Sequence, residues 1–162
     1  MDTPETNEPL PFYVLLLSVW EFAQTAELTS DDYQQDVLAF LMSEGCSHYE
    51  MSMVMRCLND LFHPNTVKES AVVHHYRRVF TRNEMDILPD SVRGFLYELG
   101  HGDNALHQDD YEMVVHALLH LSNENITVET AKALTMLRMR IHAQSDISYP
   151  FPLLPEMRPF LN

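Results

Sequence analysis

The 162-residue sequence has little glycine, little cysteine and no basic residue in its first third. Its 4 glycines compare with the roughly eleven that an average usage near 7% would give, which disfavours sandwiches and barrels rich in tight turns. Neither a GxGxxG nor a GxxxxGK(S/T) pattern occurs. Nucleotide binding through those glycine-rich, phosphate-cradling loops is therefore excluded.

Basic residues are also few, with 10 Lys plus Arg against 24 Asp plus Glu and a formal net charge of −14. The first Lys or Arg is Arg56, so the preceding segment carries acidic residues and no permanently basic side chain. Phosphate binding requires clustered Lys and Arg, and anionic membranes attract the same residues. This charge argues against nucleic acid as the main ligand and against membrane adhesion.

Cys46 and Cys57, the only two cysteines, form neither a CxxC pair nor a disulfide framework. We expect both to be structural; a reactive Cys46 beside His48 is the less favoured alternative.

The apolar run from Phe12 to Trp20 is about half the ~20 residues that a membrane span needs, and its flank is acidic, unlike that of a secretory signal. The sequence predicts a cytoplasmic protein without a membrane segment.

Apolar residues at helical spacing predict a mainly α-helical protein, with two helical hairpins and further helices around one core. Ser47 with Glu50 and Thr81 with Glu84 have the spacing of capping boxes, and Gly45 suits a left-handed helix end. A short helix follows Thr81, and Thr127 caps the last helix. The other expected helices cover about 11–26, 31–44, 48–63, 90–99, 108–121 and 128–142.

The segment from Val72 to Phe80 is rich in β-branched and aromatic residues but lacks a helical stripe. It predicts a short strand or hairpin near 71–80, which would suit the wing of a winged helix.

We expect a flexible acidic leader over 1–10 and a helical domain over 11–144, with sub-lobes at about 11–63 and 81–144. Residues 145–162 form a Pro-rich tail that packs either on its own domain or on a partner.

Three candidate ligand residues, Glu112, His116 and His120, follow one another at intervals of four residues. Two histidines at this spacing can share a zinc ion, with the carboxylate as a third ligand. However, the HExxH signature is absent, and Val114 and Leu118 place the core on another side of the helix. We therefore interpret this as a solvent-exposed face and predict no metal, cofactor or catalytic residue.

Two groups of residues could form an interaction surface. The first is a basic segment, Lys68, Arg77, Arg78 and Arg82, which contrasts with the acidic remainder of the chain. It is either a charged, solvated edge or a surface that contacts phosphates. The second is methionine-rich and includes Met51 and Met55; methionine suits adaptable binding surfaces but also fills cores.

Several motifs resemble those of the bacterial Smg family. They are Arg78-Val-Phe-Thr-x-x-Glu84, Arg93-Gly-Phe-Leu-x-x-Leu99, and Tyr111-Glu-Met-Val-Val followed by Ile126-Thr-x-Glu129. The resemblance extends over about 12–140 and implies a small, cytoplasmic, helical protein without an established activity. It also implies a frequent gene neighbour that encodes a DNA-processing protein.

The expected function is that of a non-catalytic adaptor or regulator that binds another protein. The alternative is an accessory factor in DNA processing that binds DNA through residues 68–82. The sequence does not predict an oligomeric state.

Overall fold

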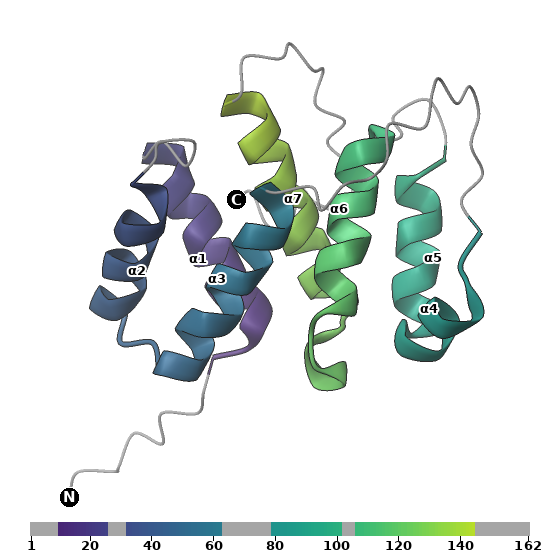
Figure 1. Ribbon diagram of the computed structural model, residues 1–162, viewed down its shortest axis with the longest axis horizontal. Helices are drawn as coiled ribbons and strands as arrows, with labels where there is room; N and C mark the ends of the chain where they lie inside the picture. The colour runs from purple at the N-terminus through teal and green to yellow at the C-terminus, as the bar shows by residue number, and fades with distance from the viewer. Residues whose placement is uncertain (1–9, 26–31, 63–78, 102–105, 145–162) are drawn as a thin grey trace, which may run out of the picture.

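The computed structural model describes residues 10–25, 32–62, 79–101 and 106–144, and it confirms a mainly α-helical protein. Within these ranges, seven α-helices and one 3-10 turn follow one another along the chain. Helix α2 lies at one edge of the molecule, and α4 and α5 lie at the opposite edge (Figure 1). The elements are α1 (Phe12–Thr25), α2 (Tyr33–Ser43), α3 (His48–Phe62), α4 (Arg82–Ile87), α5 (Asp90–Leu99), α6 (Gln108–Leu119), η1 (Asn123–Asn125) and α7 (Val128–Gln144).

The two predicted capping boxes and the predicted left-handed helix end are confirmed. The Ser47 amide donates to Glu50 Oε2 at 2.7 Å, and the Glu50 amide donates to Ser47 Oγ at 3.2 Å. Thr81 and Glu84 exchange the same pair of bonds at the start of α4. Gly45 follows α2 with φ of 76°, a conformation that costs glycine little. Local capping thus fixes where α2 ends and where α3 and α4 begin.

Helices α2 and α3 form an antiparallel hairpin. The short turn after α2 reverses the chain, and the ring of Tyr33 at the start of α2 stacks on Phe62 at the end of α3, with centroids 4.4 Å apart. Nearer the other end of α2, Phe40 stacks on Phe22 of α1 at 4.7 Å. Only Val37 and Leu41 of α2 are buried, so this helix lies on the periphery of the core.

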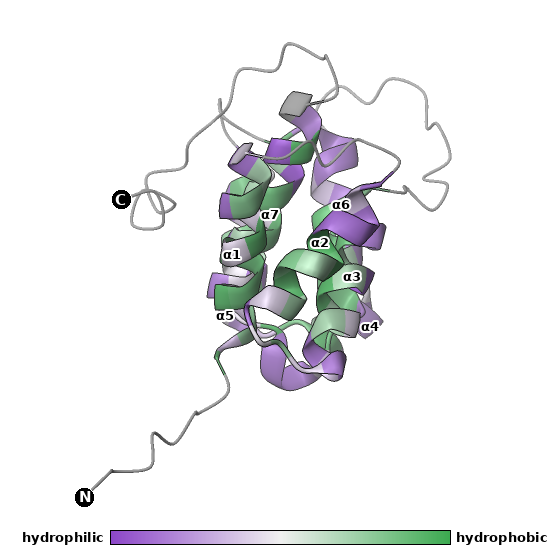
Figure 2. Cartoon of the chain, turned by 90° about the vertical axis from the view of Figure 1, so that its left-hand side faces the viewer, coloured by the Kyte–Doolittle hydropathy of each residue, from purple (hydrophilic) through white to green (hydrophobic). Residues whose placement is uncertain are grey.

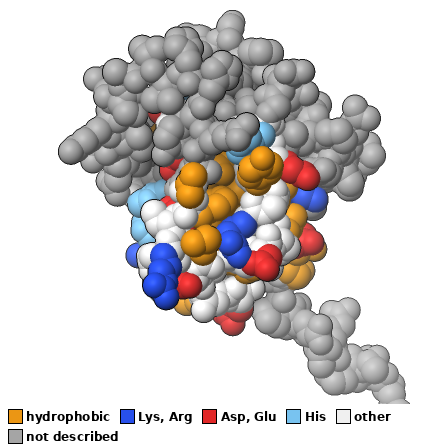
Figure 3. All heavy atoms as spheres, turned by 90° about the vertical axis from the view of Figure 1, so that its right-hand side faces the viewer, with side chains coloured by type: hydrophobic (Ala, Val, Ile, Leu, Met, Phe, Trp, Pro, Cys, Tyr) orange, Lys and Arg blue, Asp and Glu red, His pale blue; other side chains and the backbone are white. Residues whose placement is uncertain are grey.

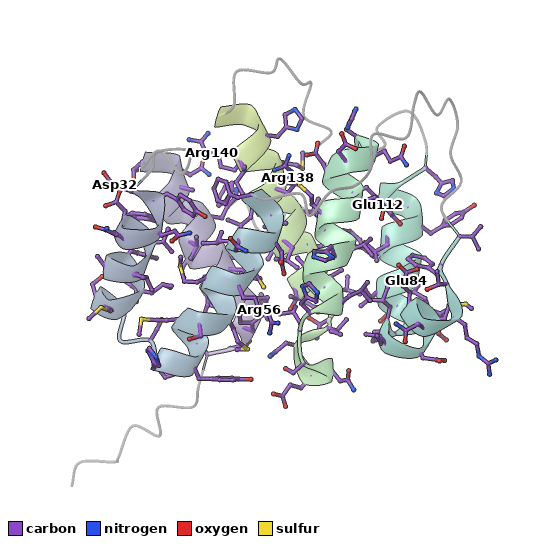
Figure 4. The ribbon with its side chains drawn as sticks, viewed as in Figure 1. Asp32, Arg56, Glu84, Glu112, Arg138 and Arg140 are labelled. Carbon is purple, nitrogen blue, oxygen red and sulfur yellow. The ribbon has the colours of Figure 1, made fainter. Side chains whose placement is uncertain are left out.

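The centre of the core is formed by α1 and α7, which lie side by side and are rich in apolar residues (Figure 2). Leu16 and Val19 of α1 and Leu134 and Leu137 of α7 are fully buried. Helix α7 also contacts α3, α5 and α6, so it joins the two halves of the chain. Arg140 Nε donates to the Ala23 carbonyl at 3.1 Å and fastens α7 to the end of α1 (Figure 4).

The predicted strand or hairpin near 71–80, and with it the winged helix, is not supported. Its described residues, Val79 and Phe80, have no strand structure, while residues 71–78 lie outside the described ranges. No strand occurs in the described residues that could pair with this segment. Without a pairing partner, β-branched residues alone cannot form a sheet. Phe80 instead packs against the helical core just before α4.

The predicted leader over 1–10 and tail over 145–162 lie outside the described residues, apart from the exposed Leu10. They stay predictions, as do the domain and sub-lobe boundaries. Among the described helices, none is both long and apolar enough to cross a membrane.

Candidate functional site

The most polar part of the interior lies along α6, which packs between α3 and α7. Among the described residues, the only buried carboxylates are Asp60 on α3, 8% exposed, and Asp110 on α6, 3% exposed. Burying a carboxylate is unfavourable unless hydrogen bonds or opposite charge compensate it. The groups that surround each of these two carboxylates therefore show how its charge is compensated.

Asp60 faces two histidines, His116 of α6 and His120, which directly follows that helix as its C-cap. His120 Nδ1 lies 2.8 Å from Asp60 Oδ2, and His116 Nε2 lies 3.8 Å from Asp60 Oδ1. The two imidazole rings meet edge to face with centroids 4.2 Å apart. Together they form a histidine–carboxylate cluster, here defined as Asp60, His116 and His120.

This arrangement corrects the prediction of a solvent-exposed face. His116 is half-buried and only His120 is exposed, because α3 packs against this side of α6. The spacing rule correctly brought His116 and His120 together. The carboxylate that joins them is Asp60 on α3, whereas Glu112 does not belong to the group of ligand atoms that lie close together.

Sequence reasoning missed Asp60, although a signal was present. Asp60 follows Cys57 by three residues and directly precedes Leu61, both of which are buried. Residues three apart share one side of a helix, so a carboxylate at this position lies at the edge of the apolar stripe. Its partners were not predictable, because His120 lies 60 residues further along the chain and His116 only slightly nearer.

Asp110 has a different partner. Arg138 Nε of α7 donates to Asp110 Oδ1 at 2.5 Å, and Arg138 Nη1 donates to the Leu61 carbonyl at 2.7 Å (Figure 4). His142 Nδ1 lies 2.8 Å from Asp110 Oδ2. Arg138 therefore ties α7 to both α6 and α3, and it neutralises the Asp110 carboxylate with a permanent positive charge.

The predicted interaction residues are only partly described. Lys68, Arg77 and Arg78 lie outside the described ranges, and Arg82 is exposed in the first turn of α4. Met51 and Met55 of α3 are half-buried and pack against the core. Their role in binding stays a prediction.

The surface formed by α2 and the first turn of α3 exposes large apolar side chains to solvent. On the outer side of α2, Leu38 is 37% and Met42 is 67% exposed, and Tyr49 in the first turn of α3 is 63% exposed. Apolar residues are also exposed at the opposite edge, where Val79, Met85 and Tyr97 occur. There, over α4 and α5, basic and acidic side chains are interspersed among them (Figure 3).

Both cysteines are free thiols. Burial raises the pKa of Cys57 to about 12, with a further contribution from the charge of Asp60. Partial burial, followed by the charges of Glu50 and Glu44, also raises the pKa of Cys46. A raised pKa reduces the thiolate fraction, so neither residue has the environment of a nucleophile.

Comparison with known proteins gives a family. Residues 13–151 match the family described as "Protein of unknown function (DUF494)". Proteins named "Protein Smg homolog" from Neisseria meningitidis and Neisseria gonorrhoeae are 40% identical to this chain over 60 residues. That segment covers 37% of this chain and 39% of each relative.

No solved structure matches the chain significantly. The Neisseria relatives confirm the resemblance to the bacterial Smg family that the motifs predicted. Because the family match spans most of the sequence, the chain belongs to this family of unknown function.

Proposed function

We propose that the protein is a non-catalytic adaptor or regulator that binds another protein through an outer surface formed by Leu38, Met42 and Tyr49. The observation that carries this proposal is the exposure of apolar side chains on a peripheral helix. Met42, at 67%, is far more exposed than a residue that serves only to fill the core.

The position of these residues favours a common surface. Leu38 and Met42 are four residues apart and share one side of α2. Met42 lies near the end of α2 and Tyr49 near the start of α3, so both are at the end of the hairpin where the two helices join. Exposed methionine and tyrosine are typical of binding surfaces, because methionine adapts its shape and tyrosine combines an apolar ring with a hydroxyl.

The negative charge of the surrounding sequence favours a positively charged partner. Asp36, Glu44 and Glu50 are close in sequence to the exposed apolar residues, and no Lys or Arg occurs before Arg56. An acidic segment that carries exposed apolar side chains is complementary to an amphipathic, basic segment of another protein. We expect the apolar side chains to supply most of the affinity and the charges to speed the encounter.

The test is site-specific photo-crosslinking in the source cells. A photoreactive amino acid replaces Met42 in one strain and Asp86 in the control strain. Asp86 is an exposed residue of α4, at the opposite edge of the molecule (Figure 1). We expect a discrete protein adduct from position 42 and none of the same mass from position 86.

The purified partner then provides the quantitative test. Replacing both Leu38 and Met42 with alanine should weaken its binding by roughly tenfold or more, the usual effect of removing central interface residues. Equal adducts from positions 42 and 86, or unchanged affinity of the double variant, would reject this surface.

A further inference from the structure

We propose that Asp60, His116 and His120 form a binding site for one zinc ion at the contact between α3 and α6. The site does not depend on the adaptor surface, because none of its three residues belongs to that surface. Two imidazoles and one carboxylate are a common set of protein ligands for Zn²⁺.

The geometry of the cluster fits one ion. Each of the three residues can offer one ligand atom, and these atoms lie within 4.8 Å of one another. At zinc–ligand distances of about 2.1 Å, tetrahedral geometry separates two ligand atoms by about 3.4 Å. The two Asp60 oxygens give distances on either side of this value, 2.8 Å from Oδ2 to His120 Nδ1 and 3.8 Å from Oδ1 to His116 Nε2. The three side chains therefore converge on one place, where rotation about their side-chain bonds would bring the donor atoms to zinc distance.

The second argument comes from charge. The two buried carboxylates, Asp60 and Asp110, can be compared with each other. Asp110 is buried beside the permanent cation of Arg138. Asp60 is also buried, yet in the described part of the chain its ion-pair partners are histidines alone. An imidazole carries positive charge only when it is protonated. With neutral imidazoles, a divalent cation would supply the positive charge that Arg138 supplies to Asp110.

Burial of the donor atoms provides the third argument. His116 Nε2 is shielded from solvent and has no hydrogen-bond partner among the described residues. A buried nitrogen without a partner loses hydration energy that coordination to a metal would restore. His120 lies at the exposed rim of the cluster, which gives the ion a route of entry and leaves its fourth position open to water.

The existing bond between His120 and Asp60 is compatible with coordination. When His120 Nδ1 carries the ring proton, it donates to Asp60 Oδ2. A neutral imidazole can carry its proton on Nε2 instead, which frees the Nδ1 lone pair for the metal. The two neutral forms have the same charge, so coordination through Nδ1 requires a tautomeric change in a neutral ring.

The test is calorimetric titration of the full-length, tag-free protein with Zn²⁺ after treatment with a chelator. We expect one ion per chain and a rise in the unfolding temperature, because the ligand binds only the folded arrangement of helices. Asp60→Asn and His116→Gln should each weaken binding by at least tenfold. His48→Gln, which alters an exposed histidine at the start of α3, and Glu112→Gln should leave it unchanged.

Circular dichroism establishes that each variant remains folded, and His120→Gln provides a ligand variant at an exposed position if Asp60→Asn unfolds the protein. The absence of saturable binding to the wild-type protein would overturn the proposal. Binding that persists in Asp60→Asn, His116→Gln and His120→Gln would also overturn it, because the ion would then bind elsewhere. Neither result would affect the crosslinking test of the adaptor surface.

Discussion

Arg138 of α7 and Asp110 of α6 form an ion pair with 2.5 Å between Nε and Oδ1, and their side chains are only 13% and 5% exposed. The same arginine donates to the carbonyl of Leu61, so one side chain connects three helices. The pair therefore fixes the position of α6, the helix that carries His116 and ends next to His120.

Replacing Arg138 with methionine should destabilise the protein by about 3 kcal/mol. The substitution preserves much of the side-chain volume but leaves the Asp110 carboxylate buried without its cation. An uncompensated buried charge lowers the free energy of unfolding strongly. Urea unfolding followed by circular dichroism gives the free energy of unfolding. Arg82→Met, at an exposed position of α4, serves as the control and should change it little. A loss no greater than that of the control would show that His142 alone compensates Asp110.

Two glycines should respond oppositely to alanine. Gly45 has φ of 76°, which L-residues adopt at a cost of about 1–2 kcal/mol, so Gly45→Ala should destabilise the protein by that amount. Gly94 lies within α5, and a Cβ added there meets no atom within 4 Å. Gly94→Ala should stabilise the protein by about 0.5–1 kcal/mol, because alanine has less backbone freedom to lose. Thermal unfolding of both variants measures the difference, and a shift of the same sign in both would contradict the backbone argument.

Cys57 should resist alkylation in the folded protein. The thiolate is the reactive form, and a pKa of about 12 leaves almost none of it at pH 8. Cys46 is half-buried and should react, but more slowly than a cysteine in a short peptide, because its pKa is also raised. Mass spectrometry after timed exposure to iodoacetamide, with and without urea, distinguishes the two residues. Rapid modification of Cys57 without urea would contradict the observed burial.

DNA should not bind with useful affinity. The net charge of −14 repels phosphates, and the winged helix that would have presented the basic segment is not supported. A gel-shift titration of the full-length protein with duplex DNA at low salt should show no complex. Salt-sensitive binding that disappears in the Arg77→Glu/Arg78→Glu double variant would instead favour the alternative function in DNA processing.

Features that depend on residues close together in the sequence were predictable, whereas features that depend on distant residues were not. The capping boxes of Ser47 and Thr81 were predictable, because both partners lie within one helical turn and need no other part of the chain. The strand predicted near 71–80 is not supported, since β-branched composition does not by itself supply a pairing partner.

The candidate site shows the same division. The sequence by itself determined that His116 and His120 lie close together, because four residues make about one turn of a helix. Only the tertiary structure decided that Asp60 faces them and that Arg138 neutralises Asp110. Those contacts join residues 60 and 28 positions apart, respectively, and they depend on how α3 and α7 pack against α6. Packing is fixed by the combined burial of many apolar side chains, so no local pattern reveals which polar groups it brings together.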